Sequence, residues 1–206
     1  MVILTNSSVM QQLQCVVFCG GLSSRMGTDK ALLPSASGNW LLHSASLLSF
    51  LPGKVLASVN EMQNEKFTTF FPADQLVSDN LQYGIRGPVC GLFSVHEKYP
   101  ENDLFVLACD MQQMNTTVLQ SLETAYLQQP GFDAYLFTTA GEPEPLCGIY
   151  CSKGLKKLYA LYLSGALKRH SMKYMLCQLN PFYIPATDDL MVCFSNFNSP
   201  EDIASE

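Results

Sequence analysis

The sequence predicts an α/β fold: one doubly wound, mainly parallel, Rossmann-like sheet with helices on both faces. In the first half of the chain a β-rich run is followed by a helical pattern four times over, which favours parallel strands joined by right-handed crossovers. Hydrophobic residues make up 48% of the chain and charged residues 15%, so the chain is not disordered and a buried sheet is expected. The 206 residues would fit one α/β domain or two small ones, and with no obvious linker we expect a single domain over residues 1–206.

The individual elements have their own signals. LQCVVFC, 13–19, is an apolar run typical of a buried strand, and WLLHSASLLSFL, 40–51, has the pattern of an amphipathic helix that stops at Pro52-Gly53. DLFVLACD, 103–110, is the clearest strand. The other elements predicted in this half are strands at 54–60 and 75–79 and helices at 61–70, 89–98 and 115–128. The second half is less regular, with strands expected at 132–139, 144–151, 182–185 and 190–196 and helices at 153–164 and 167–179.

Charge and cysteine content exclude several classes of function. A net charge of −6 and a pI near 5.0 argue against a nucleic-acid-binding surface. The start of the chain lacks a signal peptide and no stretch approaches the ~18 apolar residues of a membrane span, so we expect a cytoplasmic protein without a membrane partner. The eight cysteines include no C-x-x-C pair, and His43, His96 and His170 are isolated, so zinc is not predicted.

The stretch VVFCGGLSSRMGTDKALLP, residues 16–34, is the first candidate for chemistry. Its paired glycines follow a strand and precede the basic side chains of Arg25 and Lys30, an arrangement that suits a phosphate group. It is neither a Walker loop, because Gly21 and Gly27 enclose five residues, nor a dinucleotide fingerprint. Surface lysine and arginine residues are commonly only solvated charges. We nevertheless expect Arg25 and Lys30 to be functional, because nothing else explains the glycines that lie around Arg25 and just before Lys30.

Small or polar residues end all four strands of the first half. They are Gly20 with Gly21, then Asn60, Asp79 and Asp110. In doubly wound sheets the ligand crevice lies beyond the carboxyl ends of the strands, so these residues are predicted to share one rim. Asp110 is the candidate ligand for Mg²⁺, which accepts one or two carboxylates and completes its shell with phosphate oxygens and water. The alternative for Asp110 is a helix N-cap.

Several motifs resemble the molybdenum cofactor guanylyltransferase family, within the nucleotidyltransferase superfamily. The first is G-G-L-S-S-R-M-G-T-D-K at 20–30, similar to the family's G-G-x-S-x-R-M-G-x-D-K, and the last is F-S-N-F-N-S-P-E-D-I at 194–203. V-N at 59–60, S-D at 78–79, R-G-P-V-C-G at 86–91 and A-C-D-M at 108–111 lie between them in the family's order. The chain departs from the family at Phe18-Cys19, usually Leu-Ala, and at Gln112, usually proline.

The resemblance implies transfer of GMP from GTP to molybdopterin or Mo-molybdopterin, with Mg²⁺ as cofactor. It implies catalytic roles for Arg25, Lys30 and Asp110, with Asp110 as the metal ligand. The substrate-binding residues it implies are Gly20, Gly21, Asn60, Asp79, Gly87, Pro88, Gly91, Asn196 and Asn198. For the pterin end Lys168, Arg169 and Lys173 are further candidates, and molybdoenzymes or their chaperones are candidate partners.

Two alternatives stay open. One is another nucleotidyltransferase that uses CTP or acts on a sugar or isoprenoid phosphate. In the related cytidylyltransferases, however, alanine is usual at the position of Gly20, and the pattern at Gly87, Pro88 and Gly91 differs. The other alternative is a catalytically weak module that binds nucleotide or cofactor, suggested by the departure at Gln112. Release of pyrophosphate separates an enzyme from such a module.

Overall fold

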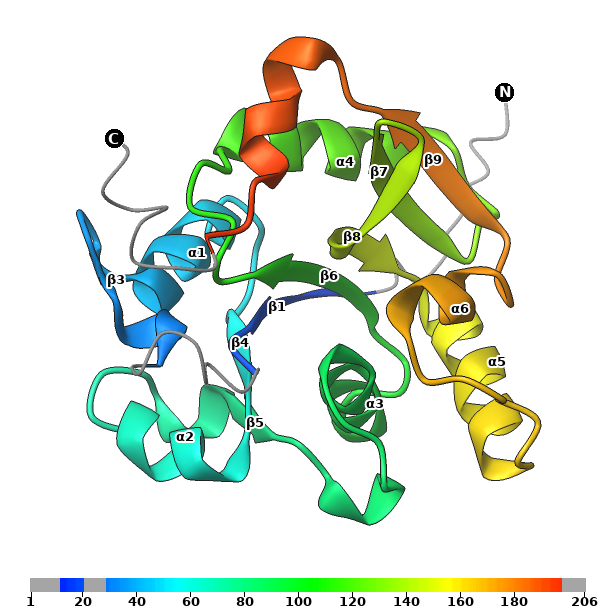
Figure 1. Ribbon diagram of the computed structural model, residues 1–206, viewed down its shortest axis with the longest axis horizontal. Coiled ribbons are helices and arrows are strands. Elements are labelled where there is room, and N and C mark those ends of the chain that lie inside the picture. The colour runs from blue at the N-terminus through cyan, green and yellow to red at the C-terminus, as the bar shows by residue number, and fades with distance from the viewer. Residues whose placement is uncertain (1–11, 21–28, 198–206) are drawn as a thin grey trace, which may run out of the picture.

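A seven-stranded sheet in the order β5-β4-β1-β6-β8-β7-β9 forms the centre of the molecule (Figure 1). The computed structural model describes residues 12–20 and 29–197. The strands of this sheet are β1 (Leu13–Phe18), β4 (Leu56–Val59), β5 (Leu76–Ser78), β6 (Asp103–Ala108), β7 (Ala134–Thr139), β8 (Glu142–Tyr150) and β9 (Pro181–Pro185). All neighbouring pairs are parallel except the two that involve β8, which confirms the mainly parallel sheet.

Helices cover both faces of the sheet, as the sequence predicts. One face is covered by α1 (Trp40–Leu48), α2 (Glu61–Phe67) and α4 (Thr116–Gln128). The other face is covered by α3 (Pro88–Lys98), α5 (Ser152–Leu163) and α6 (Met172–Leu176). Figure 1 shows α1 and α4 on one side of β1 and β6, with α3, α5 and α6 on the opposite side. A small ribbon of β2 (Pro34–Ser35) and β3 (Gly38–Asn39) lies outside the main sheet.

The central strands are buried on both faces because their apolar side chains alternate between two cores. In β1, Val17 packs into the core beneath α1, and Val16 and Phe18 pack into the core beneath α3. All six residues of β6 are buried, including Asp103, which accepts hydrogen bonds from the Tyr126 hydroxyl (2.7 Å) and the Ser152 amide (2.7 Å). Continuous burial of this kind is expected for parallel strands covered by helices.

The strand order reverses direction at β1. From β1 the chain runs outward through β4 to β5 and then returns to place β6 on the other side of β1. Phe18 pairs with Ala108 at the end of the β1–β6 ladder, and the Cys109 amide donates to the Phe18 carbonyl at 3.0 Å. The carboxyl ends of β1 and β6 therefore lie side by side at the switch point of the sheet, where ligands bind in this class of fold.

One predicted strand of the second half is wrong, and one predicted helix is shorter than expected. The apolar run 190–196 is not a strand, because residues 188–194 form the 3₁₀ helix η4 (Asp188–Phe194). Cys193 and Phe194 are both buried while Val192 is 51% exposed, so burial does not alternate as a half-buried strand requires. The helix expected at 167–179 is limited to α6, because Ser171 caps it by accepting from the Tyr174 amide at 3.3 Å.

Across the described residues, no helix is both long and apolar enough to cross a bilayer.

Candidate active site

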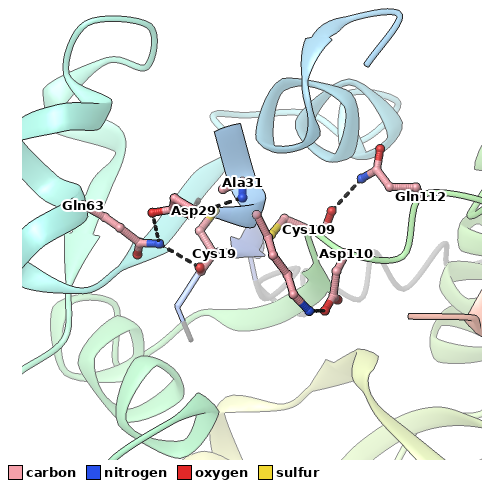
Figure 2. A network of polar contacts seen from close by, with 8 residues as sticks. Cys19, Asp29, Ala31, Gln63, Cys109, Asp110 and Gln112 are labelled. Atoms are coloured by element: carbon pink, nitrogen blue, oxygen red, sulfur yellow. Dashed lines mark hydrogen bonds and ion pairs between the residues drawn. The ribbon is translucent and has the colours of Figure 1, made fainter. Parts of the chain in front are cut away.

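Lys30 and Asp110 form an ion pair at the switch point of the sheet. Lys30 opens the 3₁₀ helix η1 (Lys30–Leu32), and Asp110 lies two residues beyond the end of β6. The distance from Lys30 Nζ to Asp110 Oδ2 is 3.2 Å, and the two side chains are 19% and 21% exposed. Figure 2 shows Asp110 in the turn after β6, with this ion pair drawn as a dashed line. The contact brings together two residues that the sequence predicts to be catalytic.

Asp110 is not the N-cap of the helix that follows it. That position belongs to Asn115, whose side chain accepts from the Val118 amide at 3.1 Å. The turn after β6 is instead held by Gln112, whose Nε2 donates to the Cys109 carbonyl at 2.6 Å (Figure 2). The Phe197 amide donates to the Asp110 carbonyl at 3.2 Å. The Asp110 carboxylate therefore remains available to face a ligand and to pair with Lys30.

Asp79 lies between two glycines. It directly follows β5, and its amide donates to the Val59 carbonyl at 2.8 Å. A Cβ atom on Gly20 would lie 3.9 Å from Asp79 Oδ2, and one on Gly91 would lie 3.4 Å from Asp79 Oδ1. Burial raises the pKa of the Asp79 carboxyl to about 6. A half-buried carboxylate flanked by bare backbone can accept hydrogen bonds from a flat ligand that approaches closely.

Asn60 and Gly87 begin the two helices that start at this rim. Asn60 caps α2: its Oδ1 accepts from the Gln63 amide at 3.0 Å, and Gln63 Oε1 accepts from the Asn60 amide at 2.9 Å. Gly87 precedes Pro88 at the start of α3 and has φ 78°, a conformation that favours glycine. The backbone N–H and the side-chain oxygen of Asn60 are thus both used in the helix cap, and the side-chain nitrogen Nδ2 is the group that could donate to a substrate.

The other predicted site residues fall into two groups. Gly21, Arg25 and Asn198 lie outside the described residues. Asn196 is exposed, but its neighbour Phe197 packs edge-on against Trp40 with ring centroids 6.1 Å apart, so the closing segment reaches the turn that holds Asp110. The candidates for the pterin end, Lys168, Arg169 and Lys173, are all exposed, and Lys173 pairs with Glu142 at 2.6 Å.

The side chains next to this rim do not supply a thiolate nucleophile. Cys19 and Cys109 are buried at the ends of β1 and β6, and burial raises the pKa of the Cys19 thiol well above its ordinary value. Within residues 12–20 and 29–197 there is no cluster of three or more His, Cys, Asp or Glu side chains that could hold a metal ion. No such cluster of described side chains therefore surrounds Asp110, and substrate oxygens and water are the further ligands that Mg²⁺ usually takes.

Sequence reasoning missed two residues of this region, Gln63 and Asp29. Gln63 is 3% exposed, and its Nε2 donates to the Cys19 carbonyl at 3.0 Å and to Asp29 Oδ2 at 2.7 Å (Figure 2). Asp29 Oδ1 in turn accepts from the Ala31 amide at 3.2 Å and so caps η1. The readable signal was Asn60-x-x-Gln63, which has the spacing of a capping box.

Comparison with known proteins agrees with this geometry. Residues 15–177 match the family described as MobA-like NTP transferase domain. A molybdenum cofactor guanylyltransferase of Campylobacter jejuni subsp. doylei is 29% identical over 143 residues, covering 69% of this chain and 71% of that protein. A probable molybdenum cofactor guanylyltransferase of Bacillus cereus is 28% identical over 193 residues, covering 91% of this chain and 92% of that protein.

Solved structures agree on the fold. The crystal structure of molybdopterin-guanine dinucleotide biosynthesis protein A from Archaeoglobus fulgidus superposes with a TM-score of 0.73 at 22% identity, covering 93% of this chain and 95% of that chain. A CTP-bound CMP:2-keto-3-deoxy-manno-octonic acid synthetase superposes with a TM-score of 0.66 at 12% identity, covering 94% of this chain and 96% of that chain. The family match spans most of the chain, and it includes most of β1, all of β6 and the ion pair between Lys30 and Asp110. This chain belongs to the MobA-like NTP transferase domain family and is a nucleotidyltransferase.

Proposed function

We propose that this enzyme transfers GMP from GTP to molybdopterin or Mo-molybdopterin, forming molybdopterin guanine dinucleotide and pyrophosphate. The observation that carries the proposal is the Lys30–Asp110 pair at the carboxyl ends of β1 and β6. A cation and a carboxylate placed together at this crevice suit a triphosphate that arrives with a divalent metal. The names of the relatives in Campylobacter jejuni and Bacillus cereus support guanine and the molybdenum cofactor as the specific substrates.

The residues around Asp110 fit a magnesium ion. Mg²⁺ is usually held in proteins by one or two carboxylates while substrate phosphates and water fill its other positions. Asp110 offers one such carboxylate, 21% exposed and beyond the end of a buried strand, and we assign it as the metal ligand. The metal, when bound with the triphosphate, supplies neutralisation of phosphate charge. Lys30 supplies the complementary protein cation, and Arg25 is predicted to add a second.

The nucleoside end of GTP is assigned to the rim formed by Gly20, Asp79 and Gly91. Gly20 and Gly91 present backbone without a Cβ, which gives a purine room to lie close to the chain. The N1 and N2 hydrogens of guanine require acceptors, and the Asp79 carboxylate is placed to provide one. Asn60 is assigned to the ribose or base through its side-chain nitrogen, Nδ2. Gly87 and Pro88, at the start of α3, are assigned to the same end of the substrate through close approach of their backbone, since Pro88 has no N–H and the Cys90 amide already donates to the Gly87 carbonyl at 2.9 Å.

Positioning and charge neutralisation account for the reaction without a covalent enzyme intermediate. A terminal phosphate oxygen of molybdopterin forms a bond to the α-phosphorus of GTP as the bond from that phosphorus to the β-phosphate oxygen breaks, and pyrophosphate leaves. Lys30 offsets the negative charge that grows on the α-phosphate oxygens and on the departing group. Asn196, Asn198 and the cations of 168–173 remain predictions for the pterin end, as do a cytoplasmic location and molybdoenzymes or their chaperones as partners.

The test is a pyrophosphate-release assay with purified protein, Mg²⁺ and molybdopterin, with GTP, CTP, ATP or UTP as the donor. We expect release with GTP that depends on both the metal and the pterin. A kcat/KM for CTP equal to or above that for GTP would refute the guanine assignment but keep the nucleotidyltransferase. Tight binding of GTP without pyrophosphate release from any donor would favour a binding module.

A further inference from the structure

Gln63 uses its whole side chain to connect three parts of the candidate active site. It lies in the first turn of α2 and is 3% exposed. Its Oε1 accepts from the Asn60 amide at 2.9 Å, and its Nε2 donates to the Cys19 carbonyl at 3.0 Å and to Asp29 Oδ2 at 2.7 Å. One carboxamide group therefore satisfies partners on α2, beyond the end of β1 and immediately before η1.

Asp29, one of these partners, is the residue immediately before Lys30 and caps the helix that begins with Lys30. Asp29 receives Gln63 on one carboxylate oxygen and the Ala31 amide on the other, at 3.2 Å. The second of these bonds caps η1, whose first residue is Lys30. Lys30 then reaches Asp110 at 3.2 Å (Figure 2). A continuous set of hydrogen bonds and one ion pair thus runs from Gln63 through Asp29 and η1 to Asp110.

We propose that Gln63 is a positioning residue for nucleotidyl transfer, which fixes the start of η1 against the end of β1 and thereby sets the place of Lys30 beside Asp110. This inference rests on the proposed function. A lysine side chain has a long flexible stem, so its Nζ is placed accurately only if its backbone is held. The Gln63–Asp29 hydrogen bond has a charged acceptor and a short length, which makes it one of the stronger links available to hold that backbone.

Gln63→Glu isolates the two donated hydrogen bonds. A glutamate keeps the volume of the side chain and keeps an oxygen for the Asn60 amide, so the cap of α2 is retained. A carboxylate cannot donate to the Cys19 carbonyl, and it would repel the Asp29 carboxylate. We expect kcat for pyrophosphate release to fall by roughly tenfold or more at pH 8, with a smaller change in the KM for GTP.

The pH profile separates positioning from a general loss of structure. Asp29 is the ionisable side chain in contact with residue 63. The buried thiols of Cys19 and Cys109 and the Lys30–Asp110 pair are the next ionisable groups, and they interact with Asp29 or with each other. Burial and the neighbouring carboxylate would raise the pKa of the introduced glutamate, so it takes up a proton as the pH falls toward 6. Once protonated it can donate again. We therefore expect the ratio of Gln63→Glu to wild-type kcat to rise as the pH falls, a ratio in which titrations common to both enzymes cancel.

An exchange of donor and acceptor gives an independent test. In Gln63→Glu/Asp29→Asn, the asparagine NH₂ can donate to the glutamate while its Oδ1 still accepts from the Ala31 amide. We expect this double variant to recover part of the kcat that Gln63→Glu loses at pH 8. Gln14→Glu is the matched control, because Gln14 is 8% exposed and its Nε2 donates to the carbonyls of Lys54 (2.5 Å) and Cys15 (3.2 Å) near the opposite end of β1. It should lower the melting temperature without lowering kcat.

The outcomes distinguish this inference from the proposed function. A Gln63→Glu enzyme with wild-type kcat at pH 8 overturns the positioning role. A general structural loss would overturn it too. In that case kcat falls equally at every pH, Asp29→Asn does not recover it, and Gln14→Glu shows the same loss. If the wild-type enzyme releases pyrophosphate from CTP rather than GTP, the proposed function fails, and the same variants are then assayed with CTP. Recovery of kcat at low pH with that donor would still support Gln63 as a positioning residue.

Discussion

Lys30 Nζ lies 3.2 Å from Asp110 Oδ2, joining residues that are 80 positions apart in the sequence. Both side chains are about four-fifths buried, so the pair is screened less by water than the pairs on the surface of this protein. The surface pairs include Lys156 with Glu101, 2.6 Å apart and with side chains 47% and 77% exposed. Under the proposed function, Lys30 and Asp110 would each exchange its partner for a group on the incoming nucleotide and its metal, a role we do not assign to the surface pairs.

Lys30→Ala should reduce turnover strongly and change the melting temperature little. The lysine is not part of either hydrophobic core, and single ion pairs that retain solvent contact contribute little to stability. We expect kcat/KM for GTP to fall by roughly 100-fold, which corresponds to the loss of one charged contact in the transition state. Steady-state kinetics and thermal melts measure both quantities. Lys156→Ala, which removes a surface lysine, is the control. If Lys30→Ala instead lowers stability strongly and leaves the kinetics unchanged, the role of Lys30 is structural.

Asp110→Asn should abolish most transfer while the fold stays intact. The substitution keeps the volume of the side chain and removes the charge that we assign to the metal, so a loss of about 100-fold or more in kcat is expected. Titration with Mg²⁺ should also show a weaker dependence of the remaining rate on the metal. Asp74→Asn, at a carboxylate that is 61% exposed, is the control for the same chemical change. Near-normal Mg²⁺-dependent turnover by a folded Asp110→Asn enzyme would place the metal elsewhere.

Asp79→Asn should stabilise the ligand-free protein at neutral pH. Burial raises the pKa of Asp79 from an ordinary value of 3.8 to about 6 in the folded state. Below pH 4 the carboxyl is protonated in both the folded and the unfolded chain, whereas above pH 6 the folded chain carries a charge that is poorly solvated. The Asp79 carboxyl therefore lowers the free energy of unfolding progressively as the pH rises from about 4 to about 6. Above pH 6 this destabilisation stays constant.

Thermal melts of the wild type and Asp79→Asn at pH 4.5, 6 and 8 test whether Asp79 becomes destabilising as the pH rises. We expect the variant to melt a few degrees higher at pH 8 and to lose most of that advantage at pH 4.5. Its KM for GTP should rise, since the proposed function assigns the Asp79 carboxylate to the N–H groups of guanine, which an asparagine accepts less strongly. Asp74→Asn is an opposite control, because the hydrogen bond from Lys54 lowers the pKa of Asp74. A variant that is less stable than the wild type at pH 8 would contradict the prediction.

The position of Asp110 could be predicted from the sequence because two local signals agree there. The apolar run of β6 predicts a strand buried on both faces, and the carboxyl ends of such strands form the crevice. The Lys30 contact could not be predicted, because it joins η1 to the turn after β6 across 80 positions of the sequence, and no local pattern encodes such a contact. The hydrogen bonds from Gln63 to Cys19 and Asp29 could not be predicted either, since they require α2 to pack against the end of β1.

Secondary structure in the second half of the chain is harder to predict from the sequence, for a different reason. A short apolar run such as LMVCF, at 190–194, fits a strand or a helix equally well by periodicity alone. It forms η4 because Cys193 and Phe194 turn together into the core beneath α1 and α4, and Phe194 packs against Phe137 with ring centroids 5.1 Å apart. Tertiary contacts with β7 therefore decide the local conformation, and the sequence of residues 190–194 contains no pattern that predicts these contacts.

Gly91→Ala should disturb the nucleoside end of the site through Ser58. A Cβ at position 91 would lie 2.4 Å from Ser58 Oγ and 3.4 Å from Asp79 Oδ1. Ser58 is 2% exposed and lies on β4, so its hydroxyl cannot simply move into solvent. Overpacking of this kind costs about 1–3 kcal/mol, partly offset by the higher helix propensity of alanine, which is worth about 1 kcal/mol. We expect a lower melting temperature and, because Asp79 is displaced, a higher KM for GTP.

Ser58→Ala in the same chain should restore both properties. Removal of the hydroxyl leaves the Ser58 Cβ as the next closest atom of that residue, at 3.6 Å, which is an ordinary van der Waals contact. Gly154→Ala in α5 is the matched control, because its Cβ would lie 2.8 Å from the backbone carbonyl of Asp133, and that position is remote from Asp79 in the sheet order. It should lower the melting temperature and leave the KM for GTP unchanged. If Gly91→Ala raises the KM and Ser58→Ala fails to restore it, the contact between α3 and β4 does not set the place of Asp79.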